Sequence, residues 1–214
     1  MFYLPIDLAD IGRSYEAVIR INSQSGKGGA AWVLEQEHGF ALPKAMHPEF
    51  GALVQRHTEA AGGELSPAAI LAAFERAYLA RSGPLELARW RIEDEPATDE
   101  PGASLARVSA ALLADGAPRE ISGAGNGPID AFCNALRAAG IADFALLEFH
   151  EHALGSGSGS RAVAYIRIEA AGGERLFGVG IDTDIAAAAF RAILAALNRR
   201  APGAPAGAEM TQRP

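Results

Sequence analysis

Residues 121–132 read Ile-Ser-Gly-Ala-Gly-Asn-Gly-Pro-Ile-Asp-Ala-Phe, with glycines alternating at positions 123, 125 and 127 and a proline directly after the last. Glycine accepts a positive φ and lets another group approach the backbone closely. Proline fits the first turn of a helix, where its missing N–H is not needed. Apolar residues then recur with helical spacing at Ile129, Phe132, Cys133 and Leu136. The stretch therefore predicts a strand end that turns sharply into the N-terminus of a helix.

The N-terminus of such a helix is a candidate anion site. Its free N–H groups and the positive end of its dipole favour a bound carboxylate or phosphate. From these residues alone, a tight β–α turn that binds nothing is an equal alternative.

The order strand–strand–strand–helix occurs twice between residues 85 and 200, as judged from hydrophobic periodicity. The first unit has strands over 85–92, 105–113 and 119–121, an acidic loop over 93–102, an Asp-Gly hairpin at 115–116 and a helix over 128–139. The second has strands over 144–149, 162–169 and 175–180, a Gly/Ser loop over 155–160 and a helix over 184–199. We expect Ile185, Ala189, Ile193, Leu194 and Leu197 of the last helix to face inward. Because Gly178-Val-Gly180 repeats the spacing of Gly123-Ala-Gly125, the two βββα units predict pseudo-twofold symmetry.

The first part of the chain has a different pattern. Helical spacing of apolar residues predicts helices over 30–38, 48–61 and from 67 onward, the last preceded by Ser66 as an N-cap, and residues 16–22 predict a strand. We therefore expect an α+β fold. A small, mainly helical subdomain would occupy residues 1–82, a domain of two βββα repeats residues 83–201, and a disordered tail residues 202–214.

Composition narrows the classes of function. The 214 residues carry a formal net charge of −7 and show no basic run, which argues against a nucleic-acid partner. No apolar stretch reaches the roughly 20 residues that span a bilayer, and the N-terminus lacks the features of a signal peptide. A single cysteine, Cys133, allows no disulfide framework and is expected to be a small core residue. These features predict a cytoplasmic location with no membrane partner.

Sequence motifs for catalysis or nucleotide binding are incomplete. Ser23-Gln-Ser-Gly-Lys-Gly-Gly29 has Ile21 and Gly28 at two positions that a Walker A loop needs for glycine and for Ser or Thr. In the glycine stretch, Pro128 stands where a dinucleotide fingerprint has its third glycine. His150-Glu-His152 has zinc-compatible spacing, but nothing in the sequence supplies a third ligand. We predict no catalytic residues and no metal site, and the polar edge of a sheet as the default role for His150 and His152.

Several segments together resemble one enzyme family. They are Tyr3-Leu-Pro-Ile-Asp7, Gly12 to Gly29, His38-Gly39, Leu42-Pro43, Glu49-Phe50, Ile121 to Phe132, Glu151-His152-Ala153 and Gly178-Val-Gly180. They resemble the downstream part of the 2-isopropylmalate synthase family over about residues 3 to 200. The stretch from Ile121 to Phe132 resembles the leucine-binding signature of that family's regulatory domain.

The resemblance implies a regulatory role. In the family, an N-terminal (β/α)₈ barrel condenses acetyl-CoA with 2-oxoisovalerate and uses a divalent metal. Because this chain has no counterpart of the barrel's residues, we expect no cofactor here and no catalysis by this chain alone. The expected partners are L-leucine as feedback inhibitor, a second copy in a homodimer, and the catalytic barrel.

The resemblance also implies which residues bind leucine. They are Gly125, Asn126, Gly127, Ile129, Asp130, Leu146, Phe149, Ala153, Ser160, Ala162 and Ile185. The match needs a one-residue insertion between 141 and 150. Three alternatives remain open: an isoleucine-binding counterpart from citramalate synthase, a dimerisation module without a ligand, and an independent enzyme that uses His150 and His152.

Overall fold

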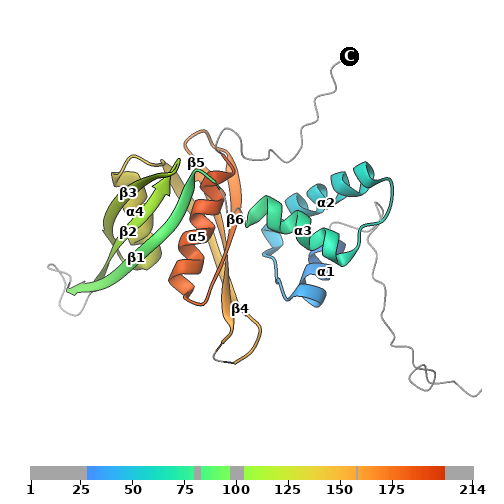
Figure 1. Ribbon diagram of the computed structural model, residues 1–214, viewed down its shortest axis with the longest axis horizontal. Helices are drawn as coiled ribbons and strands as arrows, with labels where there is room; N and C mark the ends of the chain where they lie inside the picture. The colour runs from blue at the N-terminus through green and yellow to red at the C-terminus, as the bar shows by residue number, and fades with distance from the viewer. Residues whose placement is uncertain (1–27, 80–82, 97–103, 158, 201–214) are drawn as a thin grey trace, which may run out of the picture.

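The computed structural model describes residues 28–79, 83–96, 104–157 and 159–200, and it has the expected α+β fold (Figure 1). The predicted strand over 16–22, the predicted tail and all of the Ser/Gly/Lys stretch except Gly28 and Gly29 lie outside the described residues. The helical part contains α1 (Gly29–His38), η2 (Lys44–Met46), α2 (His47–Ala61) and α3 (Pro67–Tyr78). The first repeat contains β1 (Leu85–Pro96), β2 (Ser104–Ala114), β3 (Ala117–Gly125) and α4 (Pro128–Ala138). The second contains β4 (Phe144–Leu154), β5 (Arg161–Ala170), β6 (Arg175–Asp182) and α5 (Ile185–Asn198).

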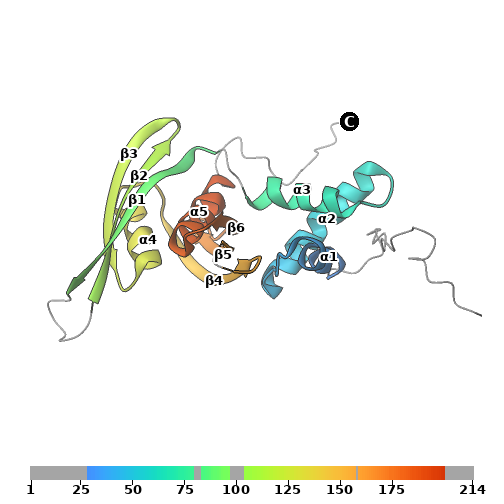
Figure 2. The same ribbon diagram turned by 60° about the horizontal axis from the view of Figure 1, so that its bottom comes forward.

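The two βββα units form a layered structure. Each has an antiparallel three-stranded sheet, in the order β1-β2-β3 and β4-β5-β6. Helices α4 and α5 lie between the two sheets (Figure 2), and one apolar core joins both helices to the inner faces of both sheets. Within it, the rings of Phe132 and Phe190 stack with their centroids 4.2 Å apart. Neither repeat has a separate core, so the predicted pair forms one unit.

The alternating glycines permit close packing of helix on strand. Gly123 and Gly125 lie within β3, so this strand continues beyond the predicted end at residue 121, and the turn is reduced to Asn126 and Gly127. A Cβ atom on Gly123 would lie 2.5 Å from the backbone N of Ala135 in α4. A Cβ on Gly178 in β6 would lie 2.1 Å from the carbonyl oxygen of Ala192 in α5. The repeated glycine pairs thus let each helix approach the third strand of its own sheet.

A β-bulge occurs at the same place in the first strand of each repeat. The pairing of β1 with β2 shifts between Leu87 and Arg89, and the pairing of β4 with β5 shifts between Leu146 and Glu148. A bulge adds one residue to a strand, so Leu146 and Phe149 both remain on the inner face, where they pack against the shared core. The bulge lies in the segment where the sequence comparison needed an insertion.

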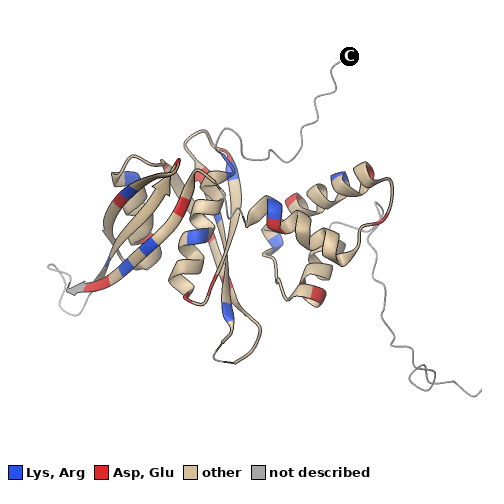
Figure 3. Ribbon diagram, viewed as in Figure 1, with Lys and Arg blue, Asp and Glu red and all other residues tan. Residues whose placement is uncertain are grey.

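The outer faces of the two sheets differ. Tyr165 of β5 and Phe177 of β6 belong to a second apolar core with α1, α2 and α3, which cover the outer face of the second sheet (Figure 2). Glu49 of α2 links this helical layer to the second repeat, because its Oε1 accepts hydrogen bonds from Tyr78 at 3.1 Å and Arg199 at 2.7 Å. On the first sheet, β1 carries interleaved acidic and basic residues (Figure 3).

Two predicted details are wrong. β1 continues as a strand to Pro96, through part of the expected acidic loop, because residues 93–96 pair with β2. Ile185 does not face inward but is 52% exposed, since it is the first residue of α5 and lies before the part of the helix that packs on the sheet. Among the described residues, no helix is long and apolar enough to cross a membrane.

Candidate functional site

The N-terminus of α4 opens onto a cavity of about 300 Å³, which we call the α4 cavity. Its walls come from the turn before α4, from one side of this helix and from the inner face of β4. It is lined by the predicted site residues Asn126, Gly127, Ile129, Asp130, Leu146 and Phe149, and also by Pro128, Cys133 and Arg137. The structure therefore brings two predicted segments, about 20 residues apart in sequence, to one cavity.

Helix α4 begins without a side-chain cap. Its N-cap residue is Gly127, which has no side chain to accept a hydrogen bond, and Pro128 has no N–H to donate. The first bond within the helix is donated by the Ala131 N–H to the Gly127 carbonyl at 2.9 Å. The N–H groups of Ile129 and Asp130 precede that bond, so they remain for an acceptor outside the helix.

Two charged side chains line the same cavity. The Asp130 carboxylate accepts a hydrogen bond from the Asn126 N–H at 3.2 Å, which holds it across the turn. Arg137 donates to the Asn134 side-chain oxygen at 2.6 Å and to the Phe144 carbonyl at 3.3 Å. The cavity thus offers helix amides, one carboxylate and one guanidinium within a small volume.

The remaining walls are apolar or neutral. Ile129, Leu146 and Phe149 pack against the shared core while lining the cavity. Burial raises the pKa of the Cys133 thiol to about 11, so at neutral pH this side chain is an uncharged part of the wall. A cavity with this lining can bind a small zwitterion that carries an aliphatic side chain.

The other predicted site residues line a second cavity. Ala153, Ser160, Ala162 and Ile185 surround a space of about 330 Å³ at the end of the β4–β5 hairpin, which we call the hairpin cavity. Its lining also includes Glu151, His152, Arg161 and Thr183. Phe149 and Ala153 are separated by about 14 Å along β4, given about 3.4 Å per strand residue. Within one chain, the predicted site is therefore divided between two cavities on the same strand.

Gly125 lines neither cavity. A Cβ atom at this position would lie 2.5 Å from the Ala131 N and 2.5 Å from a carboxylate oxygen of Asp130. The structure therefore places Gly125 beneath the first turn of α4, where it lets the helix and Asp130 approach the strand.

His152 makes contacts within the fold, whereas His150 is exposed. His152 Nε2 lies 3.1 Å from the Tyr165 hydroxyl and accepts a hydrogen bond from the Ala41 N–H at 3.2 Å. Its ring thereby joins β4 to the segment after α1. His150 Nε2 lies 3.7 Å from a carboxylate oxygen of Glu148. In the described parts of the chain, no group of three or more His, Cys, Asp or Glu side chains is placed to hold a metal ion.

Sequence reasoning missed Arg137 and Arg161 as cavity-lining residues. Arg137 follows Asp130 by two helical turns, so the spacing alone indicates a shared face of α4. Arg161 adjoins the predicted residues Ser160 and Ala162, but strand alternation gave no reason to include it.

Comparisons with known proteins agree with this architecture. Residues 64–201 match the family model described as the LeuA allosteric (dimerisation) domain, and residues 1–35 match a model described as alpha-isopropylmalate synthase, post-catalytic domain-like. The first description implies dimerisation and the binding of an effector.

Several curated relatives of this chain carry the name 2-isopropylmalate synthase. The chain is 44% identical over 200 residues to 2-isopropylmalate synthase of Mycobacterium ulcerans and 46% identical over 199 residues to that of Kineococcus radiotolerans; each match covers 92% of this chain and 34% of the relative. It is 43% identical over 197 residues to the enzyme of Clostridium acetobutylicum, covering 92% of this chain and 35% of that relative. The chain therefore spans about a third of the length of these curated relatives.

The described fold of two βββα units extends from Leu85 to Asn198 and lies within the region that the first family model matches. Because that model matches more than half of the residues, the chain belongs to the LeuA allosteric (dimerisation) domain family and is similar to the C-terminal portion of 2-isopropylmalate synthases.

Proposed function

We propose that this chain binds L-leucine in the α4 cavity as a feedback effector of leucine biosynthesis. The observation that carries the proposal is the uncapped N-terminus of α4, which opens onto a cavity with an apolar wall. The N–H groups of Ile129 and Asp130 receive the ligand carboxylate, and the Asp130 carboxylate receives its ammonium group. Leu146 and Phe149 contact the branched side chain.

Helix α5, the counterpart of α4 in the second repeat, differs from α4 at its N-terminus, and this difference supports the choice of α4. The N-terminus of α5 is capped within the chain, because the Asp184 carboxylate accepts a hydrogen bond from the Ala187 N–H at 2.8 Å. An amino-acid carboxylate at α4 would supply the corresponding acceptor from outside. Helix N-termini suit such anions because their free amides and dipole act together.

The energies are adequate for regulation. Burial of a leucyl side chain contributes about 1.5–3 kcal/mol, and allosteric coupling in proteins is typically about 1–3 kcal/mol. A modest difference in leucine affinity between two states of the assembly would therefore suffice.

We further propose that the hairpin cavity completes the leucine site across a homodimer. Ala153, Ala162 and Ile185 line this cavity, away from the α4 N-terminus of the same chain. A twofold dimer that brings the hairpin cavity of one copy to the α4 cavity of the other would form two composite sites. The apparent affinity for leucine should then rise with protein concentration, because dilution would separate the two halves.

The regulated activity is proposed to be the condensation of acetyl-CoA with 2-oxoisovalerate to 2-isopropylmalate, which takes place in the catalytic barrel of the 2-isopropylmalate synthase family. Residues of this chain would act on that barrel only through the bound effector and the dimer. No step of the condensation is assigned to them.

Isothermal titration calorimetry with Gly127→Asp tests the leucine site. A Cβ atom on Gly127 meets no other atom within 4 Å, and aspartate is a favourable N-cap residue, so the variant should fold. Its carboxylate would accept the hydrogen bonds from the N–H groups that the ligand carboxylate needs, so leucine binding should be lost. Gly172→Asp, in the turn between β5 and β6 with equally open surroundings, is the matched control and should bind leucine normally.

Three outcomes would overturn the proposal. Unchanged leucine affinity in Gly127→Asp would remove the α4 N-terminus from the site. Tighter binding of isoleucine than of leucine would favour a citramalate synthase-type regulatory domain. If neither leucine, isoleucine nor valine bound to the unaltered chain, a dimerisation module without a ligand would be favoured.

A further inference from the structure

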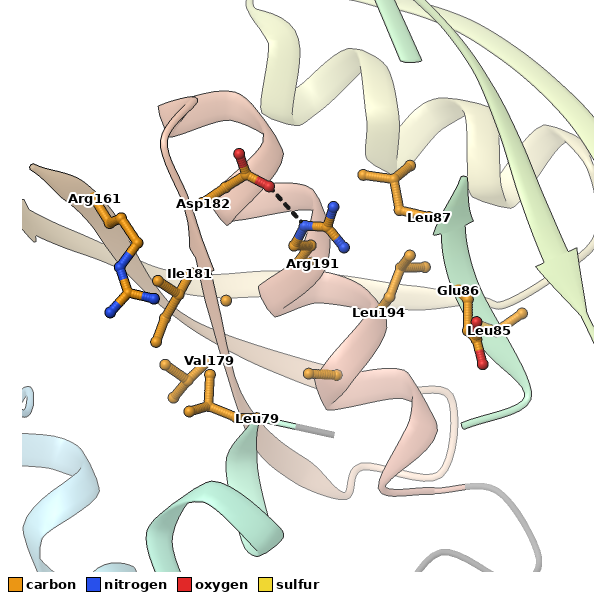
Figure 4. Close-up of a pocket in the computed structure, with 12 residues that line it drawn as sticks. Leu79, Leu85, Glu86, Leu87, Arg161, Val179, Ile181, Asp182, Arg191 and Leu194 are labelled. Atoms are coloured by element: carbon orange, nitrogen blue, oxygen red, sulfur yellow. Dashed lines mark hydrogen bonds and ion pairs between the residues drawn. The ribbon is translucent and has the colours of Figure 1, made fainter. Parts of the chain in front are cut away.

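The helical layer contacts the second repeat in three ways. Its apolar core includes Leu79, which follows α3 and lies beside β6, at the edge of the sheet where a cavity of about 360 Å³ opens (Figure 4). Glu49 of α2 binds Arg199, which follows α5. The third contact joins Ala41, in the segment after α1, to His152 of β4. Of these residues, only His152 also lines one of the two cavities proposed for leucine.

The hydrogen bonds of His152 define its neutral form. A backbone N–H can only donate, so Nε2 carries no proton where it accepts from Ala41 at 3.2 Å. The Tyr165 hydroxyl, 3.1 Å from the same nitrogen, then donates to it as well. The ring proton is therefore on Nδ1, which lies 3.1 Å from the Ala153 carbonyl oxygen. A single acceptor atom thus holds both the segment after α1 and Tyr165 of the second core.

The His152 ring packs on the second core and also borders the hairpin cavity. It stacks on the ring of Tyr165, with the centroids 5.7 Å apart and the planes inclined by 23°, and Tyr165 is buried. His152 lines the hairpin cavity together with its neighbour Ala153 and with Ala162 of β5. A change in the position of this ring therefore moves a hydrogen-bond acceptor of the helical layer and a wall of the cavity together.

The segment after α1 is anchored on both sides of Ala41. Phe40 and Leu42 are buried in the second core, and the Phe40 N–H donates to the Leu34 carbonyl of α1 at 3.1 Å. Ala41 itself is exposed, and its N–H leaves the segment to reach His152. The hydrogen bond to His152 can therefore form or break while α1 and the apolar contacts remain.

We propose that His152 couples leucine binding to the docking of the segment after α1, so that the ligand strengthens the hydrogen bond between Ala41 and His152. This coupling rests on the proposed leucine site, in which the hairpin cavity receives part of the ligand. A ligand that fills the hairpin cavity restricts the His152 ring to the position in which Nε2 meets the Ala41 N–H. Because coupling between two binding events is reciprocal, the docked segment in turn favours leucine. His152 is thus a positioning residue between the effector and the helical layer.

Amide hydrogen exchange of the full chain, followed by NMR, tests the coupling. Saturating leucine should slow exchange of the Ala41 N–H about fivefold or more, which is the lower end of usual allosteric coupling. The Met46 N–H, which donates to the Pro43 carbonyl at 2.9 Å within the helical layer, is the reference and should respond little. In His152→Phe, which keeps a ring but has no acceptor, saturating leucine should no longer slow exchange at Ala41.

A double-mutant cycle on leucine affinity, measured by calorimetry, separates the hydrogen bond from the cavity wall. Ala41→Pro removes the N–H at a residue that lines neither leucine cavity, and His152→Phe removes the acceptor. Each should weaken leucine binding about fivefold. The double variant should weaken it no further than His152→Phe, because both changes remove the same hydrogen bond.

Two further variants sharpen the cycle. His152→Gln offers a carbonyl oxygen to the Ala41 N–H and should restore part of the leucine affinity. His47→Phe is the matched control, because the His47 ring lies 3.0 Å from the Leu42 carbonyl oxygen within the helical layer, and this variant should bind leucine normally. Should Ala41→Pro not fold, the exchange measurement on His152→Phe decides.

The outcomes distinguish this coupling from the leucine site itself. If leucine binds but leaves exchange at Ala41 unchanged, or if folded Ala41→Pro binds leucine normally, the coupling is overturned and the leucine site stands. Additive losses in the double variant would also overturn it, because His152 would then act only as a wall of the cavity. Absence of leucine binding to the unaltered chain would overturn both proposals.

Discussion

The two βββα repeats share a backbone plan, yet they differ at the tips of their helices. In both, glycines in the third strand admit the helix and a bulge shapes the first strand. Helix α4 begins at an uncapped glycine beside a cavity, whereas α5 extends further toward its N-terminus and is capped by its own Asp184. The two repeats thus share the packing of helix on strand and differ at the N-terminus of the helix.

The two repeats also differ in how the outer faces of their sheets are covered. β5 is buried on both faces over Val163 to Ile166, because α1, α2 and α3 cover one face and α5 the other. In β2, the inner-face residues Ala106, Val108 and Leu112 belong to the shared core, whereas the outer face carries the polar residues Arg107 and Ser109 beside apolar ones. A strand that is covered on one side shows alternation, and a strand that is covered on both sides shows a continuous apolar run.

The largest expected effect on stability comes from substitutions at equivalent positions on the outer faces of the two sheets. Tyr165 opposes His150 in the second sheet as Ser109 opposes Arg91 in the first, and the shared bulge makes these positions equivalent. Tyr165 is 1% exposed, so Tyr165→Ser should lower the free energy of unfolding by about 3–5 kcal/mol, as for other buried aromatic side chains. Ser109→Tyr, on the uncovered face, should change it by less than about 0.5 kcal/mol. Urea unfolding measures both, and similar losses in the two variants would mean that the first sheet is also covered.

A smaller effect is expected from the helix–strand contact that both repeats share. Gly178→Ala places a Cβ atom 2.1 Å from the Ala192 carbonyl oxygen, so backbone must move and stability should fall by about 1–3 kcal/mol or more. Gly123→Ala, with its nearest atom at 2.5 Å, should cost less. Gly172→Ala meets no atom within 4 Å and is the control. The midpoint of urea unfolding ranks the three, and a harmless Gly178→Ala would contradict close packing as the reason for these glycines.

The smallest effect concerns the two helix caps. Asp184→Ala removes the cap of α5 and should lower stability by about 1 kcal/mol, whereas Gly127→Asp adds a cap to α4 and should change stability by only a few tenths of a kcal/mol. Thermal unfolding at neutral pH, without ligand, measures both shifts. If Asp184→Ala were silent, the contrast between a capped and an uncapped helix would lose its energetic basis.

The repeat could be predicted because its signals are local. Helical spacing after Pro128, the Asp-Gly hairpin and the matching glycine pairs predicted the order of strands and helices, and the structure confirms that order. Local signals did not predict that β3 continues through Gly123 and Gly125, since glycine in isolation indicates a turn and only the nearby helix explains it as a packing residue.

The sequence by itself determined the family, the α+β class and the alternation of elements, because these depend on residue spacing along the chain. The tertiary structure alone decided which face of each sheet is covered and how the predicted ligand residues divide between the α4 and hairpin cavities. The physical reason is that covering layers, cavities and opposing charges are contacts between segments far apart in sequence, and a single chain pattern carries no direct signal for them.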